Sequence, residues 1–145
     1  DNMQDLLVLA SIIEKETAQT NELKLVAGVI INRLKSGIPL GMDSTIVYDF
    51  TNGNPKNMRS IKQSDLEKNT KYNTRKFVGL PPSAIGNPGK LAIEAALNPD
   101  KTEFLYFVAD GSGGHIFAKT LKEHNKNVVQ WRKIEKKIQK NKISK

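Results

Sequence analysis

Glu16 is the residue of this sequence that is best placed for acid–base chemistry. Residues 6–17 predict a helix, and a rotation of about 100° per residue gathers its apolar side chains on one arc, made of Leu6, Leu9, Ala10, Ile12 and Ile13. Glu16 falls inside this arc, between the directions of Leu9 and Ile12. A carboxyl group buried in this way has a raised pKa, as a general acid requires. The alternative is a structural glutamate at a helix end, held by a buried arginine or by the backbone N–H groups of a loop.

Glu14 is a second carboxylate on the same predicted helix. Residues two positions apart differ by about 200° around a helix axis, so Glu14 and Glu16 face opposite ways. They cannot flank one bond of a substrate together. We therefore expect Glu14 to be solvated.

Two loop segments supply candidate ligand-binding side chains. Residues 72–74 (Tyr-Asn-Thr) and 79–89 (Gly-Leu-Pro-Pro-Ser-Ala-Ile-Gly-Asn-Pro-Gly) combine prolines with neutral hydrogen-bonding groups. Prolines reduce the entropy lost when a loop is held in one conformation. Neutral polar groups suit an uncharged polar ligand such as a sugar. The predicted substrate-binding residues are Tyr72, Asn73, Ser83 and Asn87 in these loops, with Tyr106 and His115 further along the chain.

Two further patterns resemble known functional motifs but lack their essential parts. The glycine-rich residues 110–114 are not followed by the Gly-Lys-Ser/Thr of a phosphate-binding loop, so they predict a hairpin turn. His115 and His124 have no identifiable third ligand and no His-Glu-x-x-His pattern. The sequence therefore predicts neither a metal nor a cofactor, and His115 is either structural or faces the substrate.

Spacing of apolar residues and turn signals predict the elements that position these residues. Helices are expected over residues 5–18, 21–36, 60–67 and 90–97, with a C-terminal helix that begins at Asn125 or Asn127. Strands are expected over 45–48, 104–108 and 115–118, and a turn over 52–55. The predicted fold class is α+β: a mostly helical single domain with a small antiparallel β-hairpin and long ordered loops.

Composition and charge limit the class of protein. The 145 residues suffice for one domain, and no apolar run approaches the roughly 20 residues that span a bilayer. The absence of cysteine excludes disulfides and thiolate metal sites. The net charge is +8, concentrated over residues 132–145, which fits either a solvated helix face or attraction to an anionic membrane, wall polymer or nucleic acid. A single tryptophan, Trp131, gives little support for base stacking, so nucleic acid is not expected as a partner.

Several motifs in the right order resemble the YceG-like family of endolytic murein transglycosylases over nearly the whole chain. They are residues 9–17 (Leu-Ala-Ser-Ile-Ile-Glu-Lys-Glu-Thr), 29–34 (Val-Ile-Ile-Asn-Arg-Leu), 72–74, 79–89, 106–111 (Tyr-Phe-Val-Ala-Asp-Gly), 114–117 (Gly-His-x-Phe) and 124–125 (His-Asn). The family's N-terminal membrane anchor and LysM-like region have no counterpart here. Because the sequence also begins at Asp1, close to a predicted helix, we expect residues 1–145 to be the catalytic domain of a longer membrane-anchored protein.

The resemblance implies cleavage of peptidoglycan strands between N-acetylmuramic acid and N-acetylglucosamine, in a glycan cleft beside a lysozyme-like catalytic helix. Glu16 matches the family's catalytic glutamate, and the product would carry a 1,6-anhydromuramic end. The expected location is the outer face of the cytoplasmic membrane. Expected partners are the glycan strands and cell-wall synthesis enzymes, with membrane contact only through a segment outside this chain.

The role of Asp43 and the function of the chain each have alternatives on the sequence. Glycoside hydrolysis usually needs two carboxylates, and Asp43 could be the second by stabilising positive charge on the sugar ring. Asp43 could equally cap the turn before the predicted strand. A muramidase that uses water and a non-catalytic module that binds glycan or nucleic acid are the competing functions.

Overall fold

The computed structural model describes residues 2–143, and these form a mostly helical domain with one two-stranded antiparallel sheet. The elements in chain order are α1 (Asn2–Glu16), η1 (Thr20–Glu22), α2 (Leu23–Lys35), α3 (Asp43–Thr51), η2 (Pro55–Asn57), α4 (Gln63–Glu67), α5 (Lys90–Leu97), β1 (Tyr106–Ala109), β2 (His115–Ala118) and α6 (Leu121–Ile143). The predicted α+β class is confirmed. None of the described helices is long and apolar enough to cross a bilayer.

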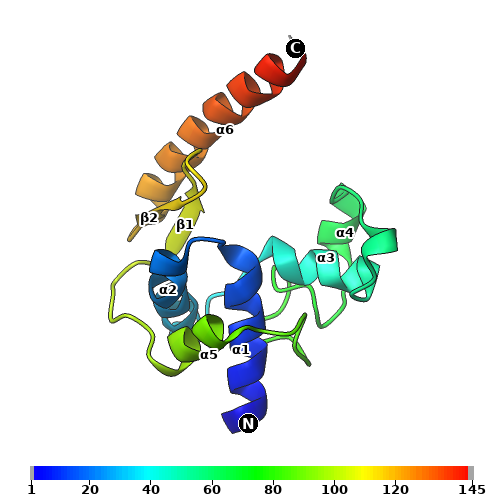
Figure 1. The fold of residues 1–145 in the computed structure, drawn as a ribbon, viewed down its shortest axis with the longest axis vertical. Helices are drawn as coiled ribbons and strands as arrows, with labels where there is room; N and C mark the ends of the chain where they lie inside the picture. Colours follow the sequence, from blue (N-terminus) through cyan, green and yellow to red (C-terminus); the bar gives the residue numbers. More distant parts are fainter. Residues whose placement is uncertain (1, 144–145) are drawn as a thin grey trace.

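Helices α1, α2 and α5 pack together to form the core (Figure 1). The apolar arc predicted on α1 is largely buried, with Ile12 and Ile13 fully enclosed. The buried side chains of α5 are all alanines, and their small size lets α5 lie close to α1 and α2. Gly28 of α2 has a similar role, because a Cβ there would collide with the carbonyl oxygen of Asp100.

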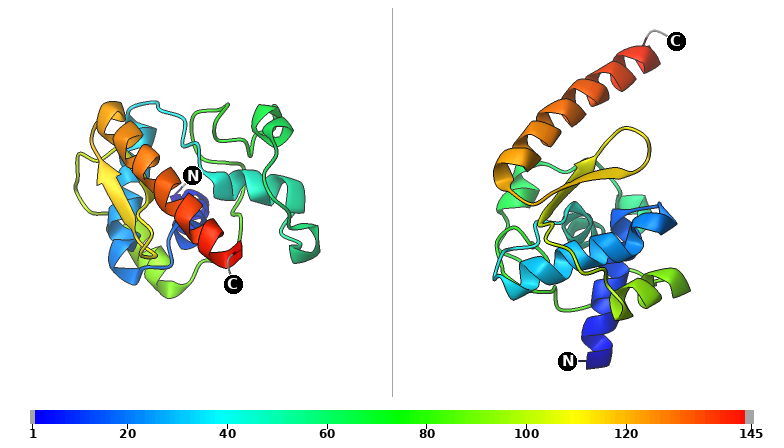
Figure 2. Two further views of the ribbon diagram at one scale, coloured as in Figure 1. Left: turned by 90° about the horizontal axis from the view of Figure 1, so that it is seen from above. Right: turned by 90° about the vertical axis from the view of Figure 1, so that its left-hand side faces the viewer.

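The hairpin and α6 stand on one side of this core (Figure 2). The β1–β2 register pairs Tyr106 with Ala118 and Ala109 with His115, and the predicted turn between the strands contains Gly111 and Gly113 at positive φ. Helix α6 packs on both strands and then projects away from the body (Figure 1).

Two segments differ from the sequence prediction. Residues 45–48 were predicted as a strand because they are β-branched and aromatic, but they lie within α3. The Thr45 hydroxyl donates to the Met42 carbonyl, and Ile46 is buried, so tertiary contacts outweigh the local β-propensity. Helix α6 begins before Asn125, because the Thr120 hydroxyl caps its start by accepting from the Glu123 N–H at 3.2 Å.

The remaining boundaries shift by a few residues. The predictions for 90–97 and 115–118 are confirmed. Helix α1 ends at Glu16, so Thr17 and Ala18 lie outside it, and Thr17 instead accepts a hydrogen bond from the Gln19 N–H at 3.0 Å. The predicted turn at 52–55 is present, with Asn52 in the left-handed region at φ 53°.

Candidate active site

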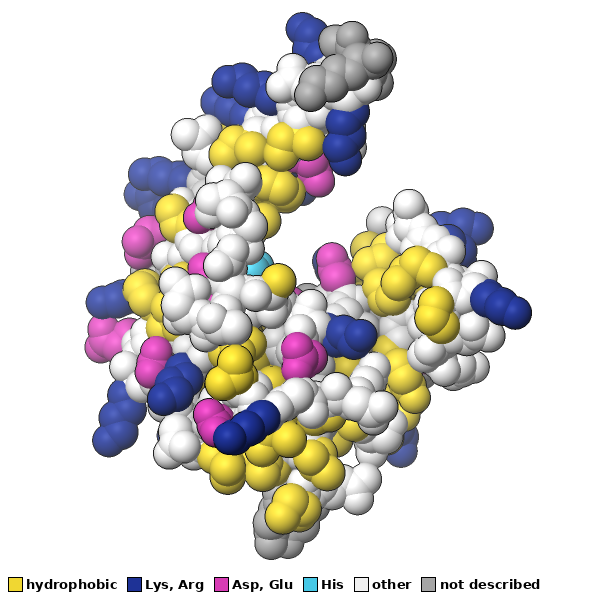
Figure 3. All heavy atoms as spheres, viewed as in Figure 1, with side chains coloured by type: hydrophobic (Ala, Val, Ile, Leu, Met, Phe, Trp, Pro, Cys, Tyr) yellow, Lys and Arg dark blue, Asp and Glu magenta, His cyan; other side chains and the backbone are white. Residues whose placement is uncertain are grey.

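A cleft of about 530 Å³ lies between the main body, the hairpin and α6. The end of α1 and the start of α3 contribute Glu16 and Asp43, while α6 contributes Trp131 and Glu135. Figure 3 shows the hollow between the hairpin–α6 arm and the part formed by α3 and α4, with acidic side chains beside it. The cleft is open to solvent and large enough for part of a polymeric ligand.

Glu16 is the last residue of α1 and is half-buried in this cleft. Burial raises the pKa of its carboxyl group. Hydrogen bonding from the Ser44 hydroxyl and backbone N–H opposes this rise, the negative charge of Asp43 adds to it, and His115 lowers the pKa slightly. Glu16 forms no ion pair with an arginine in the described part of the chain.

The first turn of α3 is held against Glu16 by a buried network centred on Thr74. The Thr74 hydroxyl accepts from the Met42 N–H at 2.9 Å and lies 2.9 Å from the Thr45 hydroxyl. The Thr74 carbonyl accepts from the Gly41 N–H at 3.0 Å. Because Thr45 and Thr74 are almost fully buried, these bonds fix where Ser44 meets the Glu16 carboxyl group.

Asn73 was predicted to bind substrate, but the structure gives its side chain an internal position. It is 1% exposed, its amide donates to the carbonyls of Leu66 and Lys68, and its Oδ1 accepts from the Arg75 N–H. A side chain so enclosed and bonded has no surface for a ligand. The motif at 72–74 thus supports the wall of the cleft.

Tyr72, Ser83 and Asn87 lie away from the Glu16 cleft. The Tyr72 hydroxyl is 2.6 Å from the Ser83 Oγ, and the Tyr72 ring lies 5.3 Å from that of Tyr48. Asn87 is exposed and lines a neighbouring cavity of about 650 Å³. The buried Ser11 hydroxyl anchors this loop to α1 by accepting from the Ile85 N–H at 3.0 Å.

His115 is held beside the cleft by Glu22, a residue for which the sequence predicts no role. Glu22 accepts from the His115 backbone N–H at 2.8 Å, its Oε1 lies 2.8 Å from His115 Nδ1, and it also accepts from the Thr17 hydroxyl at 3.1 Å. Burial alone would raise the pKa of Glu22, but these hydrogen bonds hold it below its ordinary value. The bond at Nδ1 fixes the ring orientation of His115.

Tyr106 and Asp43 both line the cleft. The Tyr106 ring stacks on the His124 ring, with 4.9 Å between the ring centroids. The Arg33 guanidinium carbon lies over the Tyr106 ring, 4.9 Å from its centroid. Burial, aided by Arg33, lowers the pKa of His124. Asp43 is the first residue of α3, and its side chain is 62% exposed with a distant ion pair to Arg75 at 3.5 Å.

The site therefore brings together Glu16, Asp43, Tyr106 and His115 of the predicted residues, and adds Ser44 and Glu22. Ser44 had a signal in the sequence, because Asp43-Ser44-Thr45 are residue types that begin helices. The pairing of Glu22 with His115 spans 93 positions and has no local signal. Among the described residues, no three His, Cys, Asp or Glu side chains gather as metal ligands.

Comparison with known proteins places this geometry in a family. A Bacillus subtilis (strain 168) protein named endolytic murein transglycosylase is 43% identical over 125 residues, covering 86% of this chain and 34% of that protein. A Streptococcus pneumoniae (serotype 2, strain D39) protein of the same name is 36% identical over 130 residues, covering 88% of this chain and 24% of that one. This chain thus spans about a third or less of the length of these two relatives.

The fold is shared with a solved structure as well. A crystal structure of a YceG-like protein from Listeria monocytogenes matches with a TM-score of 0.75 and 40% identity, over 85% of this chain and 38% of that one. Residues 1–130 match the YceG-like family, and the chain belongs to that family.

Proposed function

We propose that this chain is the catalytic domain of an endolytic murein transglycosylase that cleaves the bond between N-acetylmuramic acid and N-acetylglucosamine within a peptidoglycan strand. The observation that carries the proposal is Glu16, an acid of raised pKa in an open cleft. The names of the Bacillus and Streptococcus relatives support the substrate class.

In the proposed reaction Glu16 acts first as an acid and then as a base. Its proton passes to the glycosidic oxygen as the C1–O bond breaks, so that the leaving sugar departs as an alcohol. The resulting carboxylate then removes the proton of the muramic 6-hydroxyl while that oxygen bonds to C1. No water is consumed, and the product is a 1,6-anhydro end. A nucleophile tethered to the reacting sugar gains the advantage of an intramolecular reaction.

The other cleft residues have supporting roles in this proposal. The Tyr106 ring is held in place by His124 and Arg33, and His115 is oriented by Glu22, so both can contact the sugar without further ordering. Asp43 can favour positive charge on the sugar ring. We also propose that the whole protein acts at the outer face of the cytoplasmic membrane, anchored by a segment outside this chain, alongside cell-wall synthesis enzymes.

A muramidase that uses water is the second candidate. It is favoured by one observation: Asp43 lies close enough to Glu16 to raise its pKa, so a second carboxylate lies beside the proposed acid in the cleft. Enzymes that hydrolyse glycosides usually use two carboxyl groups, one as the acid and one as the nucleophile or base. Against it, Asp43 is exposed and faces Arg75.

Product analysis with Glu16→Gln tests the proposal. The substitution keeps shape and hydrogen bonding but removes the proton that is transferred, so strand cleavage should fall by about 10²–10⁴-fold. Glu14→Gln is the matched control, because Glu14 is exposed on the same helix and accepts only from the Gly89 N–H in the described structure. Mass spectrometry of digested wall should find anhydromuramic ends from the parent chain. Reducing muramic ends would instead establish the muramidase, and full activity in Glu16→Gln would remove Glu16 from the mechanism.

A further inference from the structure

The cavity that contains Asn87 begins one residue away from the cleft of Glu16. It has a volume of about 650 Å³ and lies between α3, η2 and the loop that contains Ile85. Lys15 and Ser44 line this cavity, whereas their neighbours Glu16 and Asp43 line the cleft. Because consecutive Cα atoms are about 3.8 Å apart, a ligand in the cavity can be joined covalently to a ligand in the cleft.

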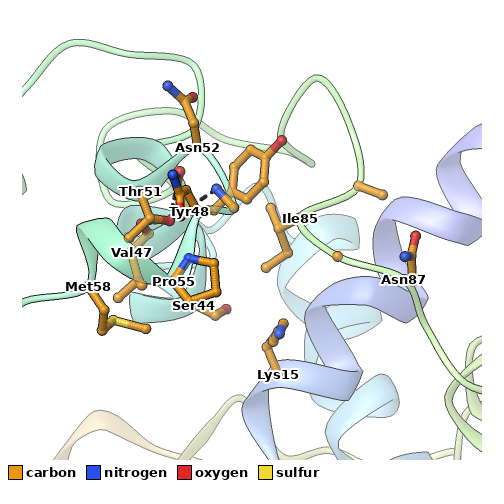
Figure 4. Close-up of a pocket in the computed structure, with 14 residues that line it drawn as sticks. Lys15, Ser44, Val47, Tyr48, Thr51, Asn52, Pro55, Met58, Ile85 and Asn87 are labelled. Atoms are coloured by element: carbon orange, nitrogen blue, oxygen red, sulfur yellow. Dashed lines mark hydrogen bonds between the residues drawn. The ribbon is translucent and has the colours of Figure 1, made fainter.

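The walls of this cavity combine an apolar base with an amide rim. Val47, Tyr48 and Ile85 form the apolar part, while Asn52 and Asn87 lie at its edge (Figure 4). The Tyr48 ring is fixed by contact with Tyr72, and Gly53 lies so close that a Cβ would be 3.4 Å from Tyr48 Cε1. Such a surface suits a ligand with small apolar groups and with amides that both donate and accept hydrogen bonds.

Lys15 gives the cavity its charge. Its side chain rises from α1 on the side of the cavity where Ser44 lies (Figure 4), and a Cβ at Gly86 would approach Lys15 Cε to 3.1 Å. No described acidic residue lines the cavity, and Lys15 has no ion pair with any described residue. An unpaired ammonium beside an apolar surface attracts a carboxylate more strongly than one in open water.

We propose that this cavity binds the peptide stem of the peptidoglycan strand, with Lys15 contacting a stem carboxylate. A peptide supplies methyl groups for the apolar base, amides for the asparagine rim and carboxylates for Lys15. A neutral saccharide would leave the ammonium without a partner. This assignment rests on the proposed function, because it requires that the cleft holds the glycan to which the stem is attached.

Binding by chains that cannot cut separates this inference from the proposed function. All variants carry Glu16→Gln, and the ligands are glycan strands with stem peptides and the same strands after an amidase has removed the peptides. The chain that carries only Glu16→Gln should bind the peptide-bearing strands about tenfold more tightly than the strands without peptides. This is the difference expected for a charge-assisted contact to the stem together with hydrogen bonds to its amides. Lys15→Met keeps the length of the side chain and removes the charge, so it should remove most of this difference. Lys15→Arg should retain it.

Lys35→Met is the matched control, since Lys35 is exposed at the end of α2 and lines neither hollow. Equal weakening of both ligands by Lys15→Met would assign the cavity to the saccharide and overturn the inference. Equal binding of the two strands by the chain with Glu16→Gln alone would overturn it as well. Failure of the parent chain to cut wall in the product assay would count against the proposed function, while these binding differences would still decide the role of Lys15.

Discussion

At the residue scale, the pKa of Glu16 is raised by burial and adjusted by two neighbours of opposite effect. Burial is the main cause of its raised pKa, Ser44 opposes the rise by hydrogen bonding, and the charge of Asp43 adds to it. The Ser44 Oγ is buried and has no other hydrogen-bond partner among the described residues. The start of α3 therefore tunes the acid as well as forming the wall beside it.

This arrangement predicts opposite pH shifts for two adjacent substitutions. Glu16 must be protonated to act as an acid, so activity falls as pH rises through its folded-state pKa. Ser44→Ala removes an influence that lowers the pKa, and the alkaline limb of the kcat/KM profile should move to higher pH. Asp43→Asn removes one that raises it, and the same limb should move to lower pH. Ser36→Ala, at the far end of α2, is the control and should leave the alkaline limb unchanged. Shifts of the same sign at positions 43 and 44 would contradict this account.

At the scale of elements, the position of α3 depends on the buried bonds of Thr74. Thr74→Val leaves the Met42 N–H without its partner and removes one of the two hydrogen-bond partners of the Thr45 hydroxyl. The expected loss is about 1–3 kcal/mol in the free energy of unfolding. Activity should fall too, because Ser44 is no longer held at Glu16. Urea unfolding and kcat/KM check both effects, with Thr74→Ser as the variant that keeps the hydroxyl. Unchanged stability in Thr74→Val would show that water replaces the lost bonds.

The same elements show which parts of the fold are readable from sequence. The arc on α1 and the hairpin follow from periodicity and turn residues, which act over short distances. The strand predicted over 45–48 is wrong because Thr45, Ile46 and Val47 favour strands locally. The contact that holds these residues in a helix comes from the Thr74 hydroxyl, 29 positions away from Thr45. Asn73 looked like a ligand-binding residue for the same reason: the carbonyls that satisfy its side chain are defined only once the loop is folded.

Within the site, the sequence singled out Glu16 as the candidate acid but not the side chains that surround it. Glu16 could be found because a carboxylate on an apolar arc is visible in helix periodicity. Ser44 could not be predicted because residues 45–48 were assigned to a strand instead of α3. Glu22 could not be predicted because it is 93 positions away from His115 along the chain. Asn87 was selected for its chemistry, and only the structure places it at the neighbouring cavity instead of the cleft.

At the scale of the whole molecule, stability and catalysis place opposite demands on acidic groups. Hydrogen bonds hold the pKa of Glu22 below its ordinary value, and the hydrogen bond from Arg59 does the same for Asp65. These carboxylates stabilise the fold above their unfolded pKa, and that stability is lost as pH falls through the folded one. Glu16 is the reverse case, since its ionised form is disfavoured in the fold.

A gain in stability is therefore expected when the charge of Glu16 is removed. Glu16→Gln should unfold at a higher temperature than the parent chain at neutral pH. The difference should shrink as pH falls toward the ordinary value of 4.5, because the parent glutamate is then protonated in both states. Thermal unfolding of the two chains across this pH range measures the difference. A difference independent of pH would attribute the effect to packing.

The position of Trp131 has a practical consequence. It is the single tryptophan of the chain, and it lies in the wall of the cleft that contains Glu16. Excitation of indole therefore samples one place in the molecule, and that place is where the glycan is expected to lie. The protein carries a built-in fluorescent reporter of cleft occupancy, so ligand entry can be followed in real time without attaching a dye.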